Sequence, residues 1–189
     1  MRQMNPLRSE TIRDAEGEVL EVGFGTGLNL AYYGPGVKTL VGLDPLDVSD
    51  VEVVQARIRG ASFPIERQAL RADGGLPFDA GRFDTIVTTW TLCSIPDVGH
   101  ALREMRRVLK SGGRYVFIEH GRADADGTAR WQDRLNPLWN RMCDGCNINR
   151  KIDRIVEDGG FEMASLDRFQ AKGPRLLGQM YRGVARRSG

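Results

Sequence analysis

The sequence is poor in cysteine and histidine, with 3 Cys and 2 His in 189 residues. An odd number of widely spaced thiols argues against a disulfide framework and is typical of proteins that fold in a reducing compartment. Two histidines also leave few ligands for a structural zinc site, which takes four Cys or His side chains. We therefore expect a chain that folds by burying apolar residues and not by forming cross-links.

The sequence also lacks a long apolar run and any block of like charge. No stretch approaches the ~20 apolar residues of a membrane helix, and residues 1–18 have no apolar core like that of a secretory signal. A net charge of +2 gives no reason to expect nucleic-acid binding. These absences predict a cytoplasmic chain without an integral membrane segment, and they leave its oligomeric state open.

The chain does contain an alternation of apolar strands and amphipathic helices. We expect helices after a glycine-rich turn within 24–33, at 49–59 with Ser49 as N-cap, at 97–113 ending at Gly112 and Gly113, at 128–142 and at 151–158. Strands are expected at 19–23, 38–44, 64–70, 82–90, 114–120, 161–169 and 179–187. The alternation predicts a doubly wound α/β fold with a mostly parallel seven-stranded sheet. The last strand should be antiparallel, because no crossover helix precedes it.

The first turn, EVGFGTGLN, carries Gly23, Gly25 and Gly27. Glycines there allow a tight turn and close approach of the backbone to a ligand. A dinucleotide-binding loop needs a small residue where Leu28 stands, and a phosphate loop needs a lysine that this turn lacks. Asp44 ends the next strand about 20 residues later, where a carboxylate can accept both ribose hydroxyls. Together, the glycine turn and Asp44 favour a binding site for an adenosine-type cofactor with a small carboxylate-bearing tail. The alternative is that the turn only connects a strand to a helix and binds no ligand.

These residues resemble a known family. The spacing E-x-G-x-G-x-G with the acid of GLDP resembles the class I S-adenosylmethionine-dependent methyltransferases, and the likeness runs from Val19 to Val184. It implies one methyltransferase domain over 1–189, with a short N-terminal segment at 1–18, a cofactor-binding half at 19–120, and substrate-side helices and a final strand pair at 121–189. It also implies S-adenosylmethionine as cofactor and S-adenosylhomocysteine as product.

The resemblance assigns cofactor roles residue by residue. It implies that the glycines and Glu21 line the methionine end, that Asp44 holds the ribose, and that Asp73 lies near the adenine amino group. Thr88 and Thr89 would border the sulfonium, although threonine at the end of a strand is also ordinary strand filling. The complete expected cofactor set is Glu21, Gly23, Gly25, Gly27, Asn29, Asp44, Pro45, Asp73, Thr89 and Trp90.

The second half of the chain narrows the resemblance. LCSIPD, EHG, WQDRLNPLW and DGCNINR together resemble small bacterial relatives of the methyltransferase-like proteins that methylate thiols. This favours a small-molecule acceptor, with a thiol or sulfide first and arsenite, an amine or a phospholipid head group as alternatives. A non-catalytic cofactor-binding protein is the alternative of another class, and Leu28 disfavours a nicotinamide-dependent oxidoreductase. Relatives carry an additional N-terminal helix over the cofactor and animal members a membrane anchor, so the short segment 1–18 predicts a more open site without an anchor.

Three residues are candidates for catalysis: His120, Glu119 and Arg150. A thiol acceptor must be deprotonated, since the thiolate is the nucleophile. His120 is the better base by its ordinary pKa, and its neighbour Glu119 should point to the opposite face of the strand. Arg150 would stabilise an anionic acceptor or form an ion pair with Asp144 or Asp153. His100 is expected to face solvent, while the tryptophans at 90, 131 and 139 would wall the acceptor pocket or, for the last two, pack in the core.

The spacing C-x-x-C in RMCDGCNINRKI admits several readings. Zinc held by Cys93, His120, Cys143 and Cys146 is conceivable, but the ligands are few, so we expect no metal. A redox pair would need a preceding strand, whereas a helix is predicted there. Trivalent arsenic would need several dedicated cysteines. We therefore interpret Cys93 as a small buried hydrophobe and Cys143 as incidental. In the resembling family Cys146 belongs to an element with Asn147 and Arg150.

Overall fold

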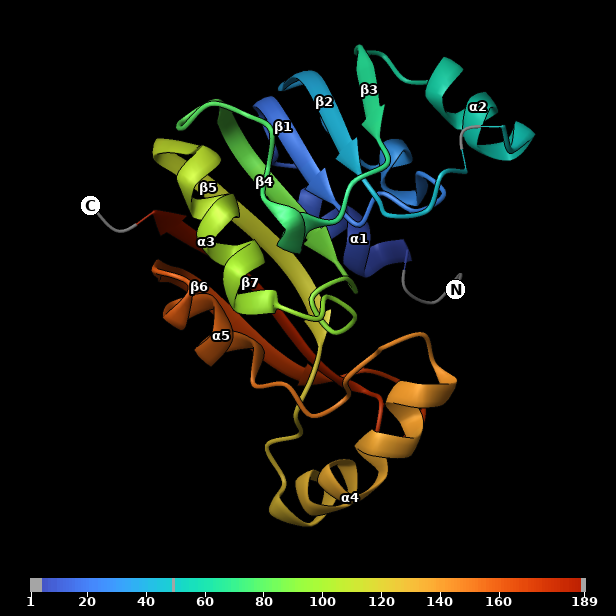
Figure 1. The fold of residues 1–189 in the computed structure, drawn as a ribbon, viewed down its shortest axis with the longest axis vertical. Helices are drawn as coiled ribbons and strands as arrows, with labels where there is room; N and C mark the ends of the chain where they lie inside the picture. The colour runs from blue at the N-terminus through green and yellow to red at the C-terminus, as the bar shows by residue number, and fades with distance from the viewer. Residues whose placement is uncertain (1–4, 49, 188–189) are drawn as a thin grey trace.

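The computed structural model describes residues 5–48 and 50–187, which form a seven-stranded sheet in the order β3-β2-β1-β4-β5-β7-β6 (Figure 1). The pairs are parallel except that β7 runs antiparallel to β5 and β6. The predicted fold class, with its antiparallel last strand, is confirmed. The strands are β1 Gly17–Val22, β2 Val37–Leu43, β3 Ile65–Gln68, β4 Phe83–Thr89, β5 Leu109–His120, β6 Phe161–Gln170 and β7 Gln179–Arg187.

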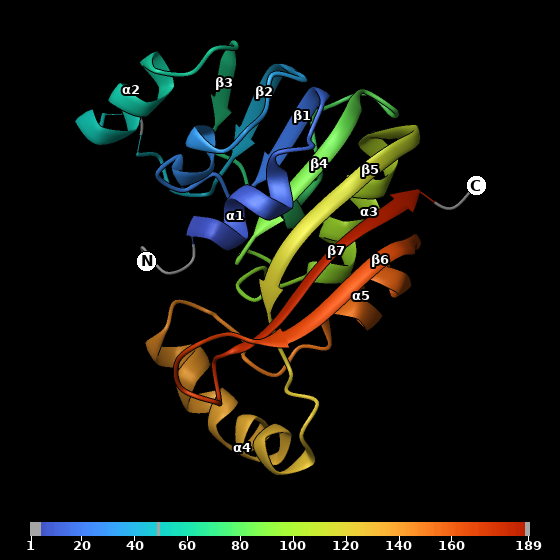
Figure 2. The same cartoon turned by 180° about the vertical axis from the view of Figure 1, so that it is seen from behind.

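Helices cover both faces of this sheet. Figures 1 and 2 show α3 and α5 on one face, α1 on the other, and α4 beyond the carboxyl end of β5. The helices are α1 Asn5–Ile12, α2 Glu52–Arg59, α3 Val98–Val108, α4 Asp126–Met142 and α5 Ile152–Asp158, with 3₁₀ turns η2 Leu28–Ala31 and η3 Ala72–Gly74. Within residues 5–48 and 50–187, no helix has both the length and the apolar character needed to cross a membrane.

The core lies in two layers, one on each side of the sheet. Val19 and Val87 pack in the layer on the α1 side, whereas their neighbours Leu20 and Ile86 pack in the layer below α3 and α5. Successive strand residues point to opposite faces, so strands covered on both sides read as continuous apolar runs. This is why the sequence predicted the central strands well.

Several element boundaries differ from the prediction, and three of the differences have a clear cause or place. The turn after Gly27 gives only the short η2 and not a full helix, because Gly34, Pro35 and Gly36 interrupt the chain. Helix α3 ends at Val108 and not at the glycines, because Leu109 pairs with Phe83 and starts β5. Helix α2 begins at Glu52, and its expected cap at position 49 lies outside the described residues.

The segment before β1 contains a helix that the sequence did not predict. Of the residues of α1, only Thr11 and Ile12 are buried, so its apolar pattern is too sparse to predict a helix. The helix packs against β5 and η2. Arg8 of this helix contacts Asn29 and Thr89 beside the glycine loop, so the segment before β1 contributes a residue to this region.

Candidate active site

A cleft of about 510 Å³ opens at the carboxyl ends of β1, β2 and β4. Its walls include Gly23 after β1, Asp44 and Pro45 after β2, and Trp90 after β4. The sheet order runs outward from β1 in one direction and from β4 in the other, so the cleft lies where the strand order reverses. Open α/β sheets bind ligands at this place. Six residues of the expected cofactor set therefore line one cleft: these four together with Asp73 and Thr89.

The glycine loop is fixed by its backbone and by Asp44. Gly23 has a φ of +83°, and a Cβ on it would come within 2.0 Å of Thr91 Oγ1. The backbone N–H of Gly25 donates to Asp44 Oδ2 at 2.8 Å, and that of Leu46 donates to Oδ1 at 2.9 Å. Each carboxylate oxygen keeps a further acceptor position. Asp44 is thus oriented by the loop and can still accept hydrogen bonds from a ligand.

A buried polar network lies under the loop. Glu21 is 1% exposed; its Oε1 accepts a hydrogen bond from Asn29 Nδ2 at 2.8 Å and its Oε2 one from Tyr33 Oη at 2.8 Å. Burial raises the pKa of Glu21 to about 7, while the two hydrogen bonds and the charge of Arg8 oppose the rise. The carboxyl group is therefore poised to ionise near neutral pH when a cation arrives.

Arg8 completes this end of the site and was missed by sequence reasoning. Its guanidinium donates to Asn29 Oδ1 at 2.5 Å and to Thr89 Oγ1 at 3.1 Å, and it lies 4.6 Å from the centroid of the Trp90 ring. A smaller pocket of about 100 Å³ is lined by Arg8, Glu21 and Asn29 together with Gly23 and Gly25 of the glycine loop, but not by Gly27. A lone arginine in a helix without an apolar stripe gives no sequence signal.

Thr88 and Thr89 have different surroundings. Thr89 Oγ1 faces the network just described, whereas Thr88 is fully buried and its Oγ1 lies 2.8 Å from Tyr115 Oη. Successive strand residues point to opposite faces, so only one of the pair can line the site. The expectation that Thr88 borders the reaction centre is wrong.

Asp73 sits in a braced segment at the other end of the cleft. Its carboxylate pairs with Arg71 at 3.0 Å, which lowers its pKa, and it accepts the backbone N–H of Asp97 at 3.3 Å. His100 Nδ1 donates to the carbonyl oxygen of Asp73 at 3.1 Å. His100 was expected to face solvent, but it is half-buried and braces the segment instead.

Glu119 and His120 end β5 and make different contacts there. Glu119 is fully buried, and its Oε2 accepts the backbone N–H groups of Thr91 and Leu92 at 2.8 and 3.1 Å. Burial raises the pKa of Glu119 to about 7. This carboxyl group therefore holds the loop after β4. The ring of His120 is half-buried, and its Nε2 lies 3.4 Å from Cys146 Sγ.

Three potential metal ligands converge at this point in the described part of the chain. The two sulfurs of Cys93 and Cys146 and one ring nitrogen of His120 all lie within 4.8 Å of one another, and Cys143 is not part of the group. Hydrogen bonding to the Cys93 thiol and the nearby ring of His120 lower the pKa of Cys146, whereas the Cys146 sulfur and burial raise the pKa of Cys93. The interpretation of Cys93 as only a buried hydrophobe is incomplete.

Arg150 lies beside these thiols. It donates to the carbonyl oxygens of Leu92 and Ile95, the latter at 2.8 Å, and burial lowers its pKa while the nearby thiols oppose the change. The expected ion pair with Asp144 or Asp153 is wrong, and Asp153 pairs with Arg168 instead. In the part of the chain that the structure describes, the partners of Arg150 are these backbone carbonyls, and no carboxylate is in direct contact with its charge.

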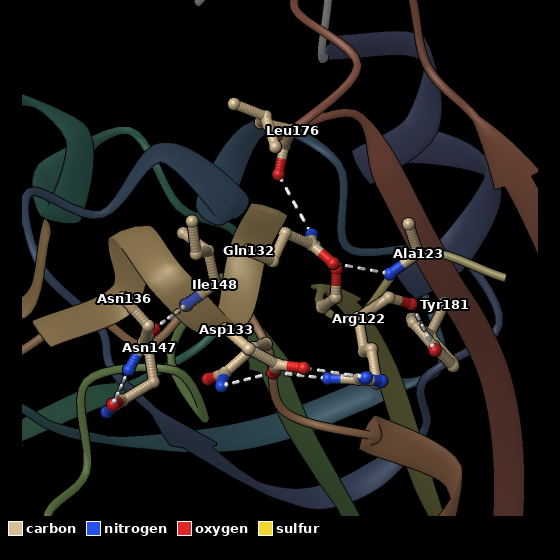
Figure 3. A network of polar contacts seen from close by, with 11 residues as sticks. Arg122, Ala123, Gln132, Asp133, Asn136, Asn147, Ile148, Leu176 and Tyr181 are labelled. Carbon is tan, nitrogen blue, oxygen red and sulfur yellow. Dashed lines mark hydrogen bonds and ion pairs between the residues drawn. The ribbon is translucent and has the colours of Figure 1, made fainter. Parts of the chain in front are cut away.

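Helix α4 positions the turn that carries Cys146. Figure 3 shows Asn136 accepting the backbone N–H of Ile148 at 2.9 Å and Gln132 accepting that of Ala123 at 2.8 Å. Gln132 also donates to the carbonyl oxygen of Leu176 at 2.9 Å. The helix is therefore tied by polar contacts to both the turn and the segment before β7.

The tryptophans divide between the site and the surface. Trp90 lines the cleft and has a φ of +53°. Trp131 is 56% exposed, so the alternative of core packing is wrong for it. The ring nitrogen of Trp139 is buried and has no hydrogen-bond partner among the described residues, while its N–H helps to lower the pKa of Cys146.

Comparisons with known proteins place the chain in a family. The family described as Methyltransferase domain matches residues 20–117. Thiol S-methyltransferase TMT1A of Homo sapiens is 33% identical over 155 residues, which cover 81% of this chain and 63% of the human protein. The chain thus spans less than two thirds of that relative. Phosphatidylethanolamine N-methyltransferase of Cereibacter sphaeroides is 29% identical over 150 residues, with 78% and 71% covered.

A solved structure agrees with the fold. N-methyltransferase NodS from Bradyrhizobium japonicum WM9, in complex with S-adenosyl-L-homocysteine, matches with a TM-score of 0.70 at 19% identity, covering 100% of this chain and 86% of that chain. At this identity the likeness concerns the fold alone. The family match and the relative above 30% identity decide the assignment: the chain belongs to the class I S-adenosylmethionine-dependent methyltransferases.

Proposed function

We propose that the chain transfers the methyl group of S-adenosylmethionine to a small thiol. The observation that carries the proposal is the group of His120, Arg150 and thiols next to the wall of the cofactor cleft. Positive and hydrogen-bonding groups around sulfur favour a thiolate, which is the nucleophile that such a reaction needs. The printed activity of the human relative supports the same acceptor class.

The cofactor end uses the loop and network described above. Glu21 and Asn29 would bind the methionine part of the cofactor, with Gly23, Gly25 and Gly27 allowing its close approach. Asp44 and Pro45 would hold the ribose, and Asp73 would lie at the adenine. Thr89 and Trp90 would lie nearest the sulfonium. The complementary charges of Glu21 and Arg8, at one end of the site, suit a ligand tail that carries both an amino and a carboxylate group.

The acceptor end separates the roles of the three catalytic candidates. His120 and Arg150 would stabilise the acceptor thiolate, because both lie among the thiols. Glu119 acts through the backbone amides of the loop after β4, so it is a positioning residue. S-adenosylmethionine supplies the methyl group as a sulfonium already activated for displacement. The chain itself has to bind both reactants, align them and exclude water.

A panel of acceptors tests the proposal. Formation of S-adenosylhomocysteine would be followed with equal concentrations of an alkyl thiol, a primary amine, arsenite and phosphatidylethanolamine vesicles. We expect the thiol to give the highest rate, about tenfold or more above the others, because the site favours a sulfur anion. A faster reaction with any other acceptor would overturn the thiol assignment while leaving methyl transfer intact.

Cofactor affinity should rise with pH through the raised pKa of Glu21. The pKa of Glu21 is about 7 in the folded chain, above its ordinary value of 4.5. In the empty site the carboxyl group therefore stays largely protonated between these two pH values and ionises only as the pH rises through about 7. The cationic amino group of the cofactor needs the ionised form of Glu21 as its partner. The dissociation constant should therefore be about tenfold larger at about pH 6 than at about pH 8. Titration calorimetry with S-adenosylmethionine at the two pH values measures the two dissociation constants. Glu21→Gln should bind weakly with a smaller slope, and an equal slope in both proteins would contradict the role.

Replacing Arg8 should weaken cofactor binding. Arg8→Ala removes the only guanidinium that contacts both Asn29 and Thr89 among the described residues. We expect a dissociation constant about tenfold larger, the cost of one hydrogen bond to a charged group. Arg13→Ala is the matched control, because Arg13 is exposed and pairs only with Asp14 in the described contacts. Tighter binding by Arg8→Ala would show that the arginine occupies the ligand's place instead.

A further inference from the structure

Two thiols and one imidazole from distant parts of the chain meet in one place. Cys93 follows β4, His120 ends β5, and Cys146 lies in the turn after α4. Their two sulfurs and one ring nitrogen all lie within 4.8 Å of one another. Thiolates with an imidazole are the ligand set that zinc prefers, whereas magnesium and calcium prefer oxygen.

The separation of two of these atoms fits a shared metal ion. Cys146 Sγ and His120 Nε2 are 3.4 Å apart. Two ligands on a tetrahedral zinc, with a sulfur at about 2.3 Å and a nitrogen at about 2.0–2.1 Å, lie about 3.6 Å from each other. Three protein ligands leave the fourth position open, which distinguishes catalytic zinc sites from structural ones.

The segments that carry the ligands are tied together without any metal. The backbone N–H of Asn147 donates to the carbonyl oxygen of Cys93 at 2.9 Å, and its side chain donates to the same oxygen at 3.0 Å. Arg150 holds the carbonyl oxygens of Leu92 and Ile95, on either side of Cys93. Asn136 holds Ile148 from helix α4 (Figure 3). A scaffold fixed in this way lowers the cost of ordering a metal site.

The group also lies beside the cofactor cleft. Ser94 and Gly145, the chain neighbours of Cys93 and Cys146, both line its wall. An ion held here would therefore lie next to the place where methyl transfer occurs. Arg150 adds a positive charge beside the thiolates, so zinc and arginine together balance two protein thiolates and one acceptor thiolate.

We propose that Cys93, His120 and Cys146 bind one zinc ion whose open position takes the sulfur of the thiol acceptor. The inference rests on the proposed thiol methylation. When the sulfur of the acceptor thiol binds the zinc ion, the thiol loses its proton to solvent. The zinc-bound sulfur then forms the new bond to the methyl carbon as the bond from that carbon to the sulfonium breaks. The electron pair of the broken bond stays on the sulfur of S-adenosylhomocysteine, and the thioether leaves the metal.

Metal content and cobalt absorption of the full chain test the site directly. Zinc would be measured by mass spectrometry after purification, and Co²⁺ would be added to metal-free protein. We expect about one equivalent of zinc, and with Co²⁺ a thiolate charge-transfer band that shifts when an alkyl thiol is added. A native chain that takes up no zinc at micromolar concentration, or a cobalt spectrum without the band, overturns the proposal.

The matched control lies in the same C-x-x-C sequence. Cys93→Ser, Cys146→Ser and His120→Gln should each weaken zinc binding about tenfold or more, whereas Cys143→Ser should bind as the native chain does. An equal loss of zinc binding in Cys143→Ser would overturn the assignment of Cys93, His120 and Cys146 as the ligands. Binding of S-adenosylmethionine shows which variants are folded. If a serine variant is unfolded, His120→Gln and native protein stripped with a chelator carry the test.

The outcome separates this inference from the proposed function. Thiol methylation that is undiminished after zinc removal overturns the zinc proposal and leaves thiol methylation standing. Zinc bound at these residues without thiol methylation overturns the proposed function, while the metal site stands on its own measurements.

Discussion

Gly23→Ala is expected to lose about 3 kcal/mol of unfolding free energy and most cofactor binding, because strain and a clash add together. Gly23 has a φ of +83°, which side chains with a Cβ rarely adopt. The new methyl group would also lie 2.0 Å from Thr91 Oγ1, 2.5 Å from its Cγ2 and 2.8 Å from its Cβ. Thr91 cannot move freely, since its N–H bonds Glu119. Denaturant unfolding and calorimetry with S-adenosylmethionine measure the two losses.

Two further variants separate the clash from the strain. Gly127→Ala is the control, because a Cβ there meets nothing within 4 Å. It should change unfolding by less than about 1 kcal/mol. In a Thr91→Gly background, Gly23→Ala should recover about half of its loss, since only the backbone strain remains. A Gly23→Ala protein that unfolds and binds like the native chain would contradict the close approach described for this loop.

Asp44→Asn is expected to weaken binding of S-adenosylmethionine about 30-fold, which corresponds to about 2 kcal/mol. The amide has nearly the same shape but offers one acceptor oxygen where the carboxylate offers two. The N–H groups of Gly25 and Leu46 already use one position on each carboxylate oxygen. The amide therefore cannot serve both backbone donors and a ribose diol.

Asp50→Asn is the matched control, because Asp50 is exposed near the same loop and does not line the cleft. It should bind the cofactor as the native chain does. The unfolding free energy of Asp44→Asn should fall by only about 1 kcal/mol, the cost of one backbone hydrogen bond. An unchanged affinity of Asp44→Asn for the cofactor would contradict the proposal that Asp44 binds the ribose.

Sequence reasoning worked where the signal is local. The central strands are buried on both faces, so runs such as FDTIVTTW predict strands without knowledge of their partners. The glycines at 23 and 25 need positive φ angles, which few other residues tolerate, and Asp44 follows at the next strand end. These features depend on neighbours in the chain, and in the structure they lie around the cleft and the smaller pocket, which share Gly23 and Thr89.

Features that depend on distant contacts were missed or, as for Cys93, His120 and Cys146, could be named only as one disfavoured alternative. Cys93 and Cys146 come together because Asn147 docks onto the carbonyl oxygen of Cys93, a contact between segments far apart in sequence. Arg150 uses backbone carbonyls, which leave no trace in the sequence. Arg8 reaches the site through a helix that tertiary packing stabilises more than its own pattern does.

Transfer of a labelled methyl group tests the central claim most directly. The chain would be incubated with S-adenosylmethionine carrying a deuterated methyl group and an alkyl thiol, and both products would be quantified by mass spectrometry. The account predicts deuterated methyl thioether and S-adenosylhomocysteine in equal amounts, and about 30-fold less of both from the Asp44→Asn protein at the same low cofactor concentration. Bound cofactor with no labelled thioether above the protein-free reaction would contradict it.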